Sequence, residues 1–414
     1  MYWQPSLPER YTNADPERLR GEIDDRRARL GDRLLILGHH YQVDEVIRHA
    51  DVTGDSLKLS QEAAARAGDG SVEHVIFCGV HFMAETADML TPAGVKVILP
   101  DLSAGCSMAD MAAYDDTVEA WELIHETLQE RHGGAWNGRV VPITYVNSSA
   151  AIKAFVGEHG GACCTSSNAA RVFEWAMAGG SEPKRPGEEI KILFLPDQHL
   201  GRNTAASFGI DVERRTGLYD PRMTAKGLGV GGMSAERVDE SEVLLWAGHC
   251  SVHKLFRPEH CDEIREADPD RKILVHPECS KEVVDKADLA GSTGFIIKTL
   301  EAAEPGSKWA VATEHNLVRR MSREMAERGV DVRILSDCQC LCTTMYRIDE
   351  PHLLWVLDGL CGIDAGGEAI EPASRNVIEV PGEVRTPALK ALDRMLELVP
   401  AAAAGAAGSG AGAG

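Results

Sequence analysis

Three cysteines stand where a metal ligand or a nucleophile could lie. Cys106 follows an apolar run at residues 95–99, Cys250 follows one at 243–246, and Cys342 comes after a third at 332–335. Each run is typical of a buried strand. Because a helix N-terminus favours negative charge, we expect Cys106, just before a helix-forming segment, to be held partly as thiolate. Taken alone, Cys106 could equally be a small buried residue.

Pairs of polar residues two positions apart end three further predicted strands. The pairs are His39 with Tyr41, Tyr145 with Asn147, and His276 with Glu278. Alternation along a strand aims both members of a pair to the same side. Histidine, tyrosine and glutamate can move protons, and asparagine offers both a donor and an acceptor. Any one of these residues alone is more often a satisfied core polar group.

Each pair is followed by a hydroxyl residue in a turn and then by one of the three cysteines. The hydroxyl residues Ser56, Ser166 and Thr293 come 15, 19 and 15 residues after the pairs, and the cysteines 50, 84 and 49 residues later. Hydroxyl and N–H groups in such turns can bind carboxylate or phosphate, although helix capping is the alternative role. Three repeats of one unit would build one central site.

Three converging thiolates can hold an iron–sulfur cluster in which one iron lacks a protein ligand and can accept a substrate oxygen as a Lewis acid. A zinc site is less favoured, because Cys338, Cys340 and Cys342 are spaced by two rather than as Cys-x2-Cys. The remaining cysteines lack equivalents in all three units and are assigned structural roles: Cys78, Cys163, Cys164, Cys261, Cys279 and Cys361.

The elements that must position these residues follow from alternating apolar and helical stretches, which predict an α/β fold with largely parallel sheets. Strands are predicted at residues 34–37, 75–78, 95–99, 140–145, 192–195, 243–246, 273–276, 295–297, 310–312 and 332–335. Helices are predicted at 15–30, 116–130, 169–178 and 388–398, and polar loops at 131–138 and 257–271. Ligands of such folds bind at the carboxyl ends of the strands.

The middle unit is longer by about 35 residues, which predicts an insertion near 196–240. Within it, residues 227–232 match a dinucleotide-binding fingerprint by letter, but no strand precedes them, so a mobile loop is the better interpretation. Arg319 and Arg320 could bind an anion, yet a solvated helix face is favoured. His40 is expected to pack behind the site.

Composition limits the class of protein. A chain of 414 residues with a net charge of -21 is not expected to bind nucleic acid or an anionic membrane. The absence of any run of about 18 apolar residues predicts no membrane span. Eleven cysteines without an export signal favour reduced thiols or metal ligation, and hence a cytoplasmic protein.

In addition, the motifs together resemble the quinolinate synthase family, in its longer form. The similarity rests on ordered stretches at residues 38–42, 54–57, 78–86, 103–110, 145–150, 165–168, 195–201, 276–279, 291–294 and 312–316. The resemblance implies three αβα sandwich domains in a pseudo-threefold arrangement around a central iron–sulfur cluster. We expect an N-terminal helical extension at 1–30, domains at 31–115, 116–265 and 266–346, C-terminal helices at 347–400, and a disordered Ala/Gly tail at 401–414.

The family condenses iminoaspartate with dihydroxyacetone phosphate to give quinolinate, phosphate and water in NAD biosynthesis. The resemblance implies a 4Fe-4S cluster on Cys106, Cys250 and Cys342, and functional coupling to an enzyme that supplies iminoaspartate, an L-aspartate oxidase or an aspartate dehydrogenase. The implied substrate-binding residues are His39, Ser56, Tyr145, Val146, Asn147, Ser166, His276, Pro277, Glu278 and Thr293; the catalytic candidates are Tyr41, Glu278, His39 and His276.

One departure leaves the third ligand open. Family members often carry it before proline in Cys-x2-Cys-x2-Cys, whereas here Thr343 follows alternating cysteines, so Cys340 competes with Cys342. Two other functions also remain open. An aconitase-like hydro-lyase would use the same three-thiolate cluster on a hydroxy acid, and a non-catalytic iron or redox sensor would use the run from Cys338 to Cys342.

Overall fold

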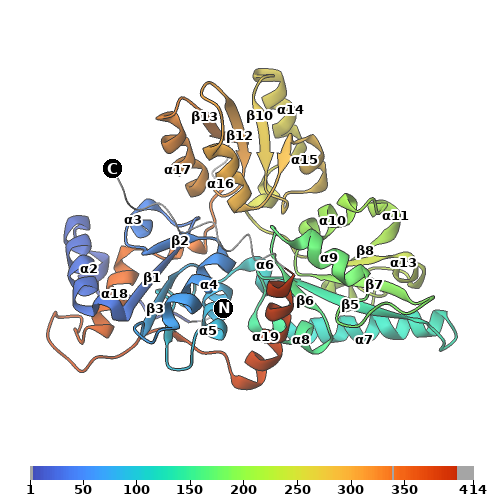
Figure 1. The fold of residues 1–414 in the computed structure, drawn as a ribbon, viewed down its shortest axis with the longest axis horizontal. Coiled ribbons are helices and arrows are strands. Elements are labelled where there is room, and N and C mark those ends of the chain that lie inside the picture. Colours follow the sequence, from blue (N-terminus) through green and yellow to red (C-terminus); the bar gives the residue numbers. More distant parts are fainter. Residues whose placement is uncertain (1–2, 338–339, 399–414) are drawn as a thin grey trace.

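The computed structural model describes residues 3–337 and 340–398. Within them the strands form three separate sheets, each accompanied by helices, and the three parts meet at the centre of the molecule (Figure 1). Successive parts of the chain build the three sheets (Figure 1), except that the last strand, Val377–Ile378, joins the first sheet. Cys338 and the predicted tail at 401–414 lie outside the described residues.

The first sheet has the strand order β14-β4-β3-β1-β2. Its strands are β1 (Leu34–His39), β2 (Val52–Gly54), β3 (His74–Cys78), β4 (Lys96–Ile98) and β14 (Val377–Ile378), and its helices are α3 (Asp44–Ile47), α4 (Ser56–Ala67), α5 (His81–Leu90) and α6 (Ser107–Asp110). The neighbouring strands pair in parallel, except that β14 runs antiparallel to β4.

The second sheet has the order β6-β5-β7-β9-β8 and is parallel throughout. Its strands are β5 (Gly138–Tyr145), β6 (Ala162–Cys164), β7 (Glu189–Leu195), β8 (Thr216–Tyr219) and β9 (Val243–Trp246). The helices of this part are α7 (Tyr114–Arg131), α8 (Ala150–Glu158), α9 (Ala169–Met177), α10 (Gln198–Ser207), α11 (Val212–Arg215), α12 (Pro221–Thr224) and α13 (Ala235–Glu240).

The third sheet, also parallel, has the order β11-β10-β12-β13. Its strands are β10 (Lys272–Val275), β11 (Leu289–Ala290), β12 (Lys308–Ala312) and β13 (Asp331–Ile334), and its helices are α14 (Pro258–Ala267), α15 (Lys281–Lys286), α16 (Thr293–Glu301) and α17 (His315–Ala326). Short 3-10 turns are η1 (Gly31–Arg33), η2 (His253–Leu255) and η3 (Met345–Arg347).

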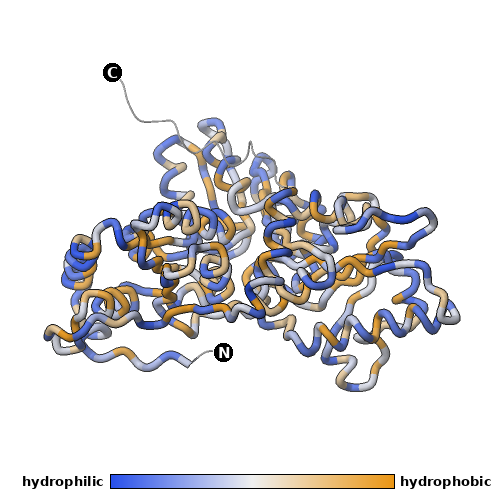
Figure 2. Tube along the Cα trace, turned by 60° about the horizontal axis from the view of Figure 1, so that its bottom comes forward, coloured by the Kyte–Doolittle hydropathy of each residue, from blue (hydrophilic) through white to orange (hydrophobic). Residues whose placement is uncertain are grey.

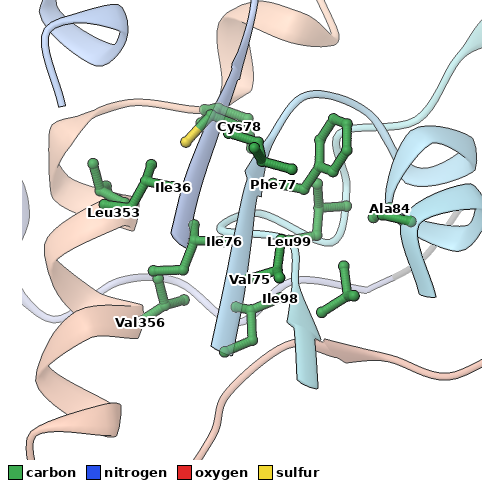
Figure 3. Packing of buried hydrophobic residues seen from close by; sticks show 14 of the residues in the cluster. Ile36, Val75, Ile76, Phe77, Cys78, Ala84, Ile98, Leu99, Leu353 and Val356 are labelled. Atoms are coloured by element: carbon green, nitrogen blue, oxygen red, sulfur yellow. The ribbon is translucent and has the colours of Figure 1, made fainter. Parts of the chain in front are cut away.

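Burial on both faces explains why apolar runs form the central strands. All six residues of β1 are buried, as expected for a parallel strand between two layers. Figure 3 shows Ile36 and Ile76 lying toward Leu353 and Val356 of α18 (Glu350–Leu360), while Phe77 points to the opposite side of the sheet. Along the whole trace, hydrophobic segments lie mainly inside and hydrophilic ones on the outer helices and loops (Figure 2).

Helices near the two ends of the chain pack against helices of the first two parts of the molecule. Near the N-terminus are α1 (Glu9–Thr12) and α2 (Pro16–Leu30), and α2 begins after Asp15, whose side chain accepts from two helix N–H groups. Its Arg26 donates to the buried Asp358 of α18 at 2.8 Å. The last helix, α19 (Gly382–Glu397), packs along α8 so closely that a Cβ on Gly157 would lie 1.9 Å from the Pro387 carbonyl oxygen.

Two sequence predictions are wrong. Residues 295–297, predicted as a strand, lie inside α16, which Ser292 caps by accepting from the Phe295 N–H. Residues 257–271, predicted as a loop, contain the helix α14. The predicted strands elsewhere overlap observed strands to within one residue at the ends that extend beyond them, whereas β2, β6, β8, β11 and β14 were not predicted.

The predicted insertion near 196–240 extends the second sheet. It contributes β8 at the sheet edge together with α10, α11, α12 and α13. Residues 227–232 form a turn closed by the Val230–Met233 bridge, and Gly231, at φ 61°, packs against Tyr219, where a Cβ would lie 2.4 Å from the ring. Only Val230 and Gly231 are buried here, whereas residues 225–229 are exposed, so the mobile loop stays a prediction. Among the described residues, no helix combines the length and apolar character needed to cross a bilayer.

Candidate active site

A cavity lies where the carboxyl ends of the three sheets face one another. Its lining includes the three polar pairs, Val146, the three turn hydroxyls and three cysteines: His39, Tyr41, Ser56, Cys106, Tyr145, Val146, Asn147, Ser166, Cys250, His276, Glu278, Thr293 and Cys342. Almost every residue that the sequence singled out is thus brought to one place. Pro277 is the exception, since its carbonyl oxygen instead accepts from the Asn203 side chain at 2.9 Å.

His39 and His276 are held in the same way. Each Nδ1 accepts the backbone N–H two residues later, from Tyr41 at 3.2 Å and from Glu278 at 3.3 Å. Burial lowers the pKa of both imidazoles to about 3, so each is neutral. A neutral ring that accepts at Nδ1 carries its proton on Nε2. Both histidines are therefore hydrogen-bond donors through Nε2.

The three hydroxyl residues lie at the start of a helix or in the turn before one. Ser56 and Thr293 are the first residues of α4 and α16, and the caps are the side chains of Asp55 and Ser292. Ser166 lies in the turn before α9, whose N-cap is Asn168. For Ser56 and Thr293, the capping role that the sequence left open belongs to the preceding residue. All three hydroxyl residues line the cavity.

The cysteine loops share one anchoring hydrogen bond. The first residue of the helix after a strand donates its N–H to a carbonyl two residues before the cysteine: His81 to Ala104 at 2.9 Å, Gln198 to Gly248 at 3.0 Å, and His315 to Cys340 at 3.1 Å. By this register Cys342 is the counterpart of Cys106 and Cys250. The Cys340 thiol is fully buried, 3.4 Å from the Ser336 hydroxyl, and is not among the residues that line the cavity.

Burial dominates the acidity of the three cavity thiols. It raises the pKa of Cys106 to about 12, although backbone N–H groups of α6 act in the opposite direction, and it also raises the pKa of Cys250 and Cys342. The expectation that Cys106 is partly a thiolate is therefore wrong for the protein without a bound metal. Buried thiols of this kind ionise when a metal binds, so three of them at one cavity fit a soft metal centre.

Glu278 is a buried carboxylate within a hydrogen-bonded network. Its Oε2 lies 2.9 Å from Nδ1 of His253, whose ring stacks on His276 with centroids 4.5 Å apart. Burial favours the neutral acid, but His253 and the hydrogen bond from the Tyr145 hydroxyl outweigh it and hold the pKa of Glu278 below its usual value. One atom each of Cys250, His253 and Glu278 lie within 4.8 Å of one another.

Sequence reasoning missed His253 and Thr313. His253 lies three residues after Cys250 and is 1% exposed, and Thr313 is fully buried at the end of β12. The Cys-x2-His spacing was a signal for His253, whereas nothing local marks Thr313. Asp197 and Glu314 were also missed; both are fully buried and begin α10 and α17 as N-caps.

Residues assigned secondary roles divide into two groups. The six cysteines given structural roles are buried or half-buried and do not line the cavity: Cys78, Cys163, Cys164, Cys261, Cys279 and Cys361. The solvated helix face predicted for Arg319 and Arg320 is wrong for Arg320. Its guanidinium binds the carbonyl oxygens of His40 and Gln42, while Arg319 is exposed.

Comparison with known proteins gives one consistent result. The family model described as quinolinate synthetase A protein matches residues 22–397. A quinolinate synthase of Streptomyces coelicolor is 48% identical over 90% of this chain and 86% of its own length. One from a Nocardioides species is 51% identical over 90% of this chain and 87% of its length. One from Herpetosiphon aurantiacus is 48% identical over 94% and 95%.

Proposed function

The chain belongs to the quinolinate synthetase A family, and we propose that it condenses iminoaspartate with dihydroxyacetone phosphate to give quinolinate, phosphate and water for de novo NAD biosynthesis. The observation that carries this proposal is convergence. Each of three sheets brings a polar pair, a turn hydroxyl and a cysteine to the same cavity. Relatives at this similarity bear the name quinolinate synthase.

Cys106, Cys250 and Cys342 would hold a 4Fe-4S cluster. Their shared register on the anchoring hydrogen bonds and their common cavity support this ligand set over one that includes Cys340. A cluster held by three thiolates supplies one iron without a protein ligand, which can polarise a substrate oxygen.

Neutral donors would bind the anionic substrates. None of the described residues that line the cavity is a lysine or an arginine. Carboxylate and phosphate oxygens would instead accept from Nε2–H of His39 and His276, from the hydroxyls of Ser56, Ser166 and Thr293, and from Asn147 and Tyr145. Hydrogen-bond donors that are already fixed in a buried site bind anions well, because the site excludes water and the donors do not have to reorient. Val146 and Pro277 would contribute through the backbone and by packing.

Tyr41 and Glu278 would manage protons and charge. Glu278 is ionised and can face an iminium or enamine N–H of the substrate. Burial and the Glu278 charge raise the pKa of Tyr41, so its hydroxyl keeps its proton at neutral pH. Tyr41 would therefore exchange protons with the substrate as a neutral hydroxyl rather than as a phenolate.

The unstable imine must be supplied by another enzyme. Coupling to an L-aspartate oxidase or an aspartate dehydrogenase is part of the proposal, since iminoaspartate is the product that such an enzyme would release. The cytoplasmic location and the division into domains at residues 115, 265 and 346 also stay predictions.

The test is an anaerobic product assay. Purified protein reconstituted with iron and sulfide is mixed with both substrates, and quinolinate is measured by mass spectrometry. We expect quinolinate to form only when both substrates are present. No quinolinate from cluster-loaded protein would refute the proposal, and dehydration of a hydroxy acid in a parallel assay would establish the aconitase-like alternative.

A further inference from the structure

The backbone around Glu278 is held by a side chain from another part of the molecule. Asn203 of α10 donates its amide to the carbonyl oxygens of Pro277 and Cys279, each at 2.9 Å. These are the residues before and after Glu278. Because both partners are acceptors, only the NH2 group of the amide can face them, and its two N–H groups match the two carbonyls. Helix α10 belongs to the second part and packs against α15 of the third (Figure 1).

The same arrangement recurs around Tyr41. Arg320 of α17 donates to the carbonyl oxygens of His40 at 3.0 Å and Gln42 at 2.6 Å, the residues before and after Tyr41. Helices α10 and α17 are equivalent, because the first residue of each donates its N–H to a carbonyl two residues before a cavity cysteine. Asn203 and Arg320 are both the sixth residue of their helix. One helix position therefore makes the same contact in two parts of the molecule.

A contact from the first part of the molecule completes the set. The equivalent helix there is α5, and the side chain of its Glu85 accepts from the Ala150 N–H at 3.0 Å. Ala150 follows the segment that carries Tyr145 and Asn147 to the cavity. Each part thus holds a segment after a strand of another part: the first holds the second, the second holds the third, and the third holds the first.

We propose that Asn203 is a positioning residue for Glu278, through which the second part of the molecule sets where a carboxylate of the third part meets the substrate. This inference rests on the proposed function and deepens it. Asn203 is not among the described residues that line the cavity, so it acts only through the backbone that it holds. A displacement of about 1 Å at a group that contacts the substrate can cost about 10²-fold in rate.

Two variants separate a hydrogen-bonding role of Asn203 from a packing role. Asn203→Asp keeps the shape of the side chain but sets carboxylate oxygens against two carbonyl oxygens, whereas Asn203→Ala removes the group. We expect kcat to fall by up to about 10²-fold, and further in Asn203→Asp than in Asn203→Ala. A packing role would give the opposite order, because only alanine loses the shape. KM for dihydroxyacetone phosphate should stay near the wild-type value, since Glu278 faces the imine N–H.

Controls use the same helix and the same chemistry. Ser207→Ala should leave kcat unchanged, because this exposed serine lies on α10 and donates to the Thr204 carbonyl of that helix. Asn203→Gln keeps both N–H groups and should retain more activity than Asn203→Ala. If Asn203→Asp does not fold, the comparison of the glutamine and alanine variants decides, and equal rates for these two would overturn the proposal.

Backbone hydrogen exchange tests the contact without turnover. In cluster-loaded protein, exchange measured by mass spectrometry should be faster over residues 276–280 in Asn203→Ala and Asn203→Asp, and unchanged there in Ser207→Ala. Quinolinate formation by the wild type tests the proposed function separately, so the exchange result stands even if no quinolinate forms. Unchanged exchange over residues 276–280, or a kcat of Asn203→Asp equal to that of Ser207→Ala, would overturn the proposal.

Discussion

Replacement of Arg320 by alanine should loosen the contact between the third part of the molecule and the segment that carries Tyr41. Arg320 of α17 donates to the carbonyl oxygens of His40 at 3.0 Å and Gln42 at 2.6 Å, and to Asp44 at 2.9 Å. Asn316, one turn earlier on the same helix, donates to the carbonyl oxygen of Tyr41 at 3.1 Å. Three consecutive carbonyls after β1 are thus held by one helix.

The magnitude follows from these contacts. A hydrogen bond from a charged donor contributes about 1.5 kcal/mol at the low end, so the two carbonyl bonds together contribute about 3 kcal/mol. The pair with Asp44 adds less than about 1 kcal/mol, because the Asp44 side chain is 38% exposed and solvent screens the pair. A loss of about 3 kcal/mol should lower the Tm by about 3–4 °C in a chain of this size.

The assay is anaerobic differential scanning calorimetry of cluster-loaded protein, with Arg319→Ala as the control. Arg319 is adjacent in sequence and exposed, so its removal should change the Tm by less than about 1 °C. Because His40 and Gln42 flank Tyr41, kcat should also fall in Arg320→Ala and not in Arg319→Ala. Equal Tm values for the two variants would refute the account of Arg320 as the residue that holds this segment.

Two further predictions concern stability. Gly157→Ala would place a methyl group against the Pro387 carbonyl and should lower the free energy of unfolding by about 1–3 kcal/mol. Gly21→Ala in α2, with no atom near the added carbon, should raise it by about 0.5–1 kcal/mol. Urea unfolding measures both changes, and similar losses in the two variants would contradict the prediction. Burial raises the pKa of Asp44, but Arg320 and Arg323 outweigh it and hold that pKa below its usual value. The stabilising pair is then complete above the usual pKa of about 4 and is lost as the pH falls through the lowered value. The Tm difference between the wild type and Asp44→Asn should therefore stay constant near neutrality and close in acid; a difference that widens in acid would exclude this linkage.

The sequence was most informative where burial is complete. Strands such as β1 and β9 are apolar at almost every position because both faces of a parallel sheet are covered, so the runs mark them directly. The strand prediction at Phe295–Ile297 was wrong because a short apolar run does not distinguish a strand from a helix. In α16, Ile296 and Leu300 are buried one turn apart while Phe295 is 42% exposed, which is the helical pattern that a three-residue window could not show.

Features that depend on contacts between residues far apart in the sequence were not predicted. Both residues of β11 are exposed, so no apolar alternation marks that edge strand. Arg320 looked like a surface residue because its partners at His40 and Gln42 lie far away in sequence. The polar pairs and hydroxyls could be predicted because the spacing repeats along the chain. The hydrogen bonds that link Tyr41 to Thr313, Thr313 to His253 and His253 to Glu278 could not be predicted, since they exist only once three separate parts of the chain have come together.

The choice between Cys342 and Cys340 tests the threefold arrangement of cluster ligands most directly. Both side chains belong to one short segment, and only the Cys342 thiol lines the cavity, in the register shared with Cys106 and Cys250. Iron and acid-labile sulfide should be measured after anaerobic reconstitution of Cys342→Ala and Cys340→Ala. We expect Cys340→Ala to keep the wild-type content and Cys342→Ala to lose it. An intact cluster in Cys342→Ala, with loss in Cys340→Ala, would contradict the account.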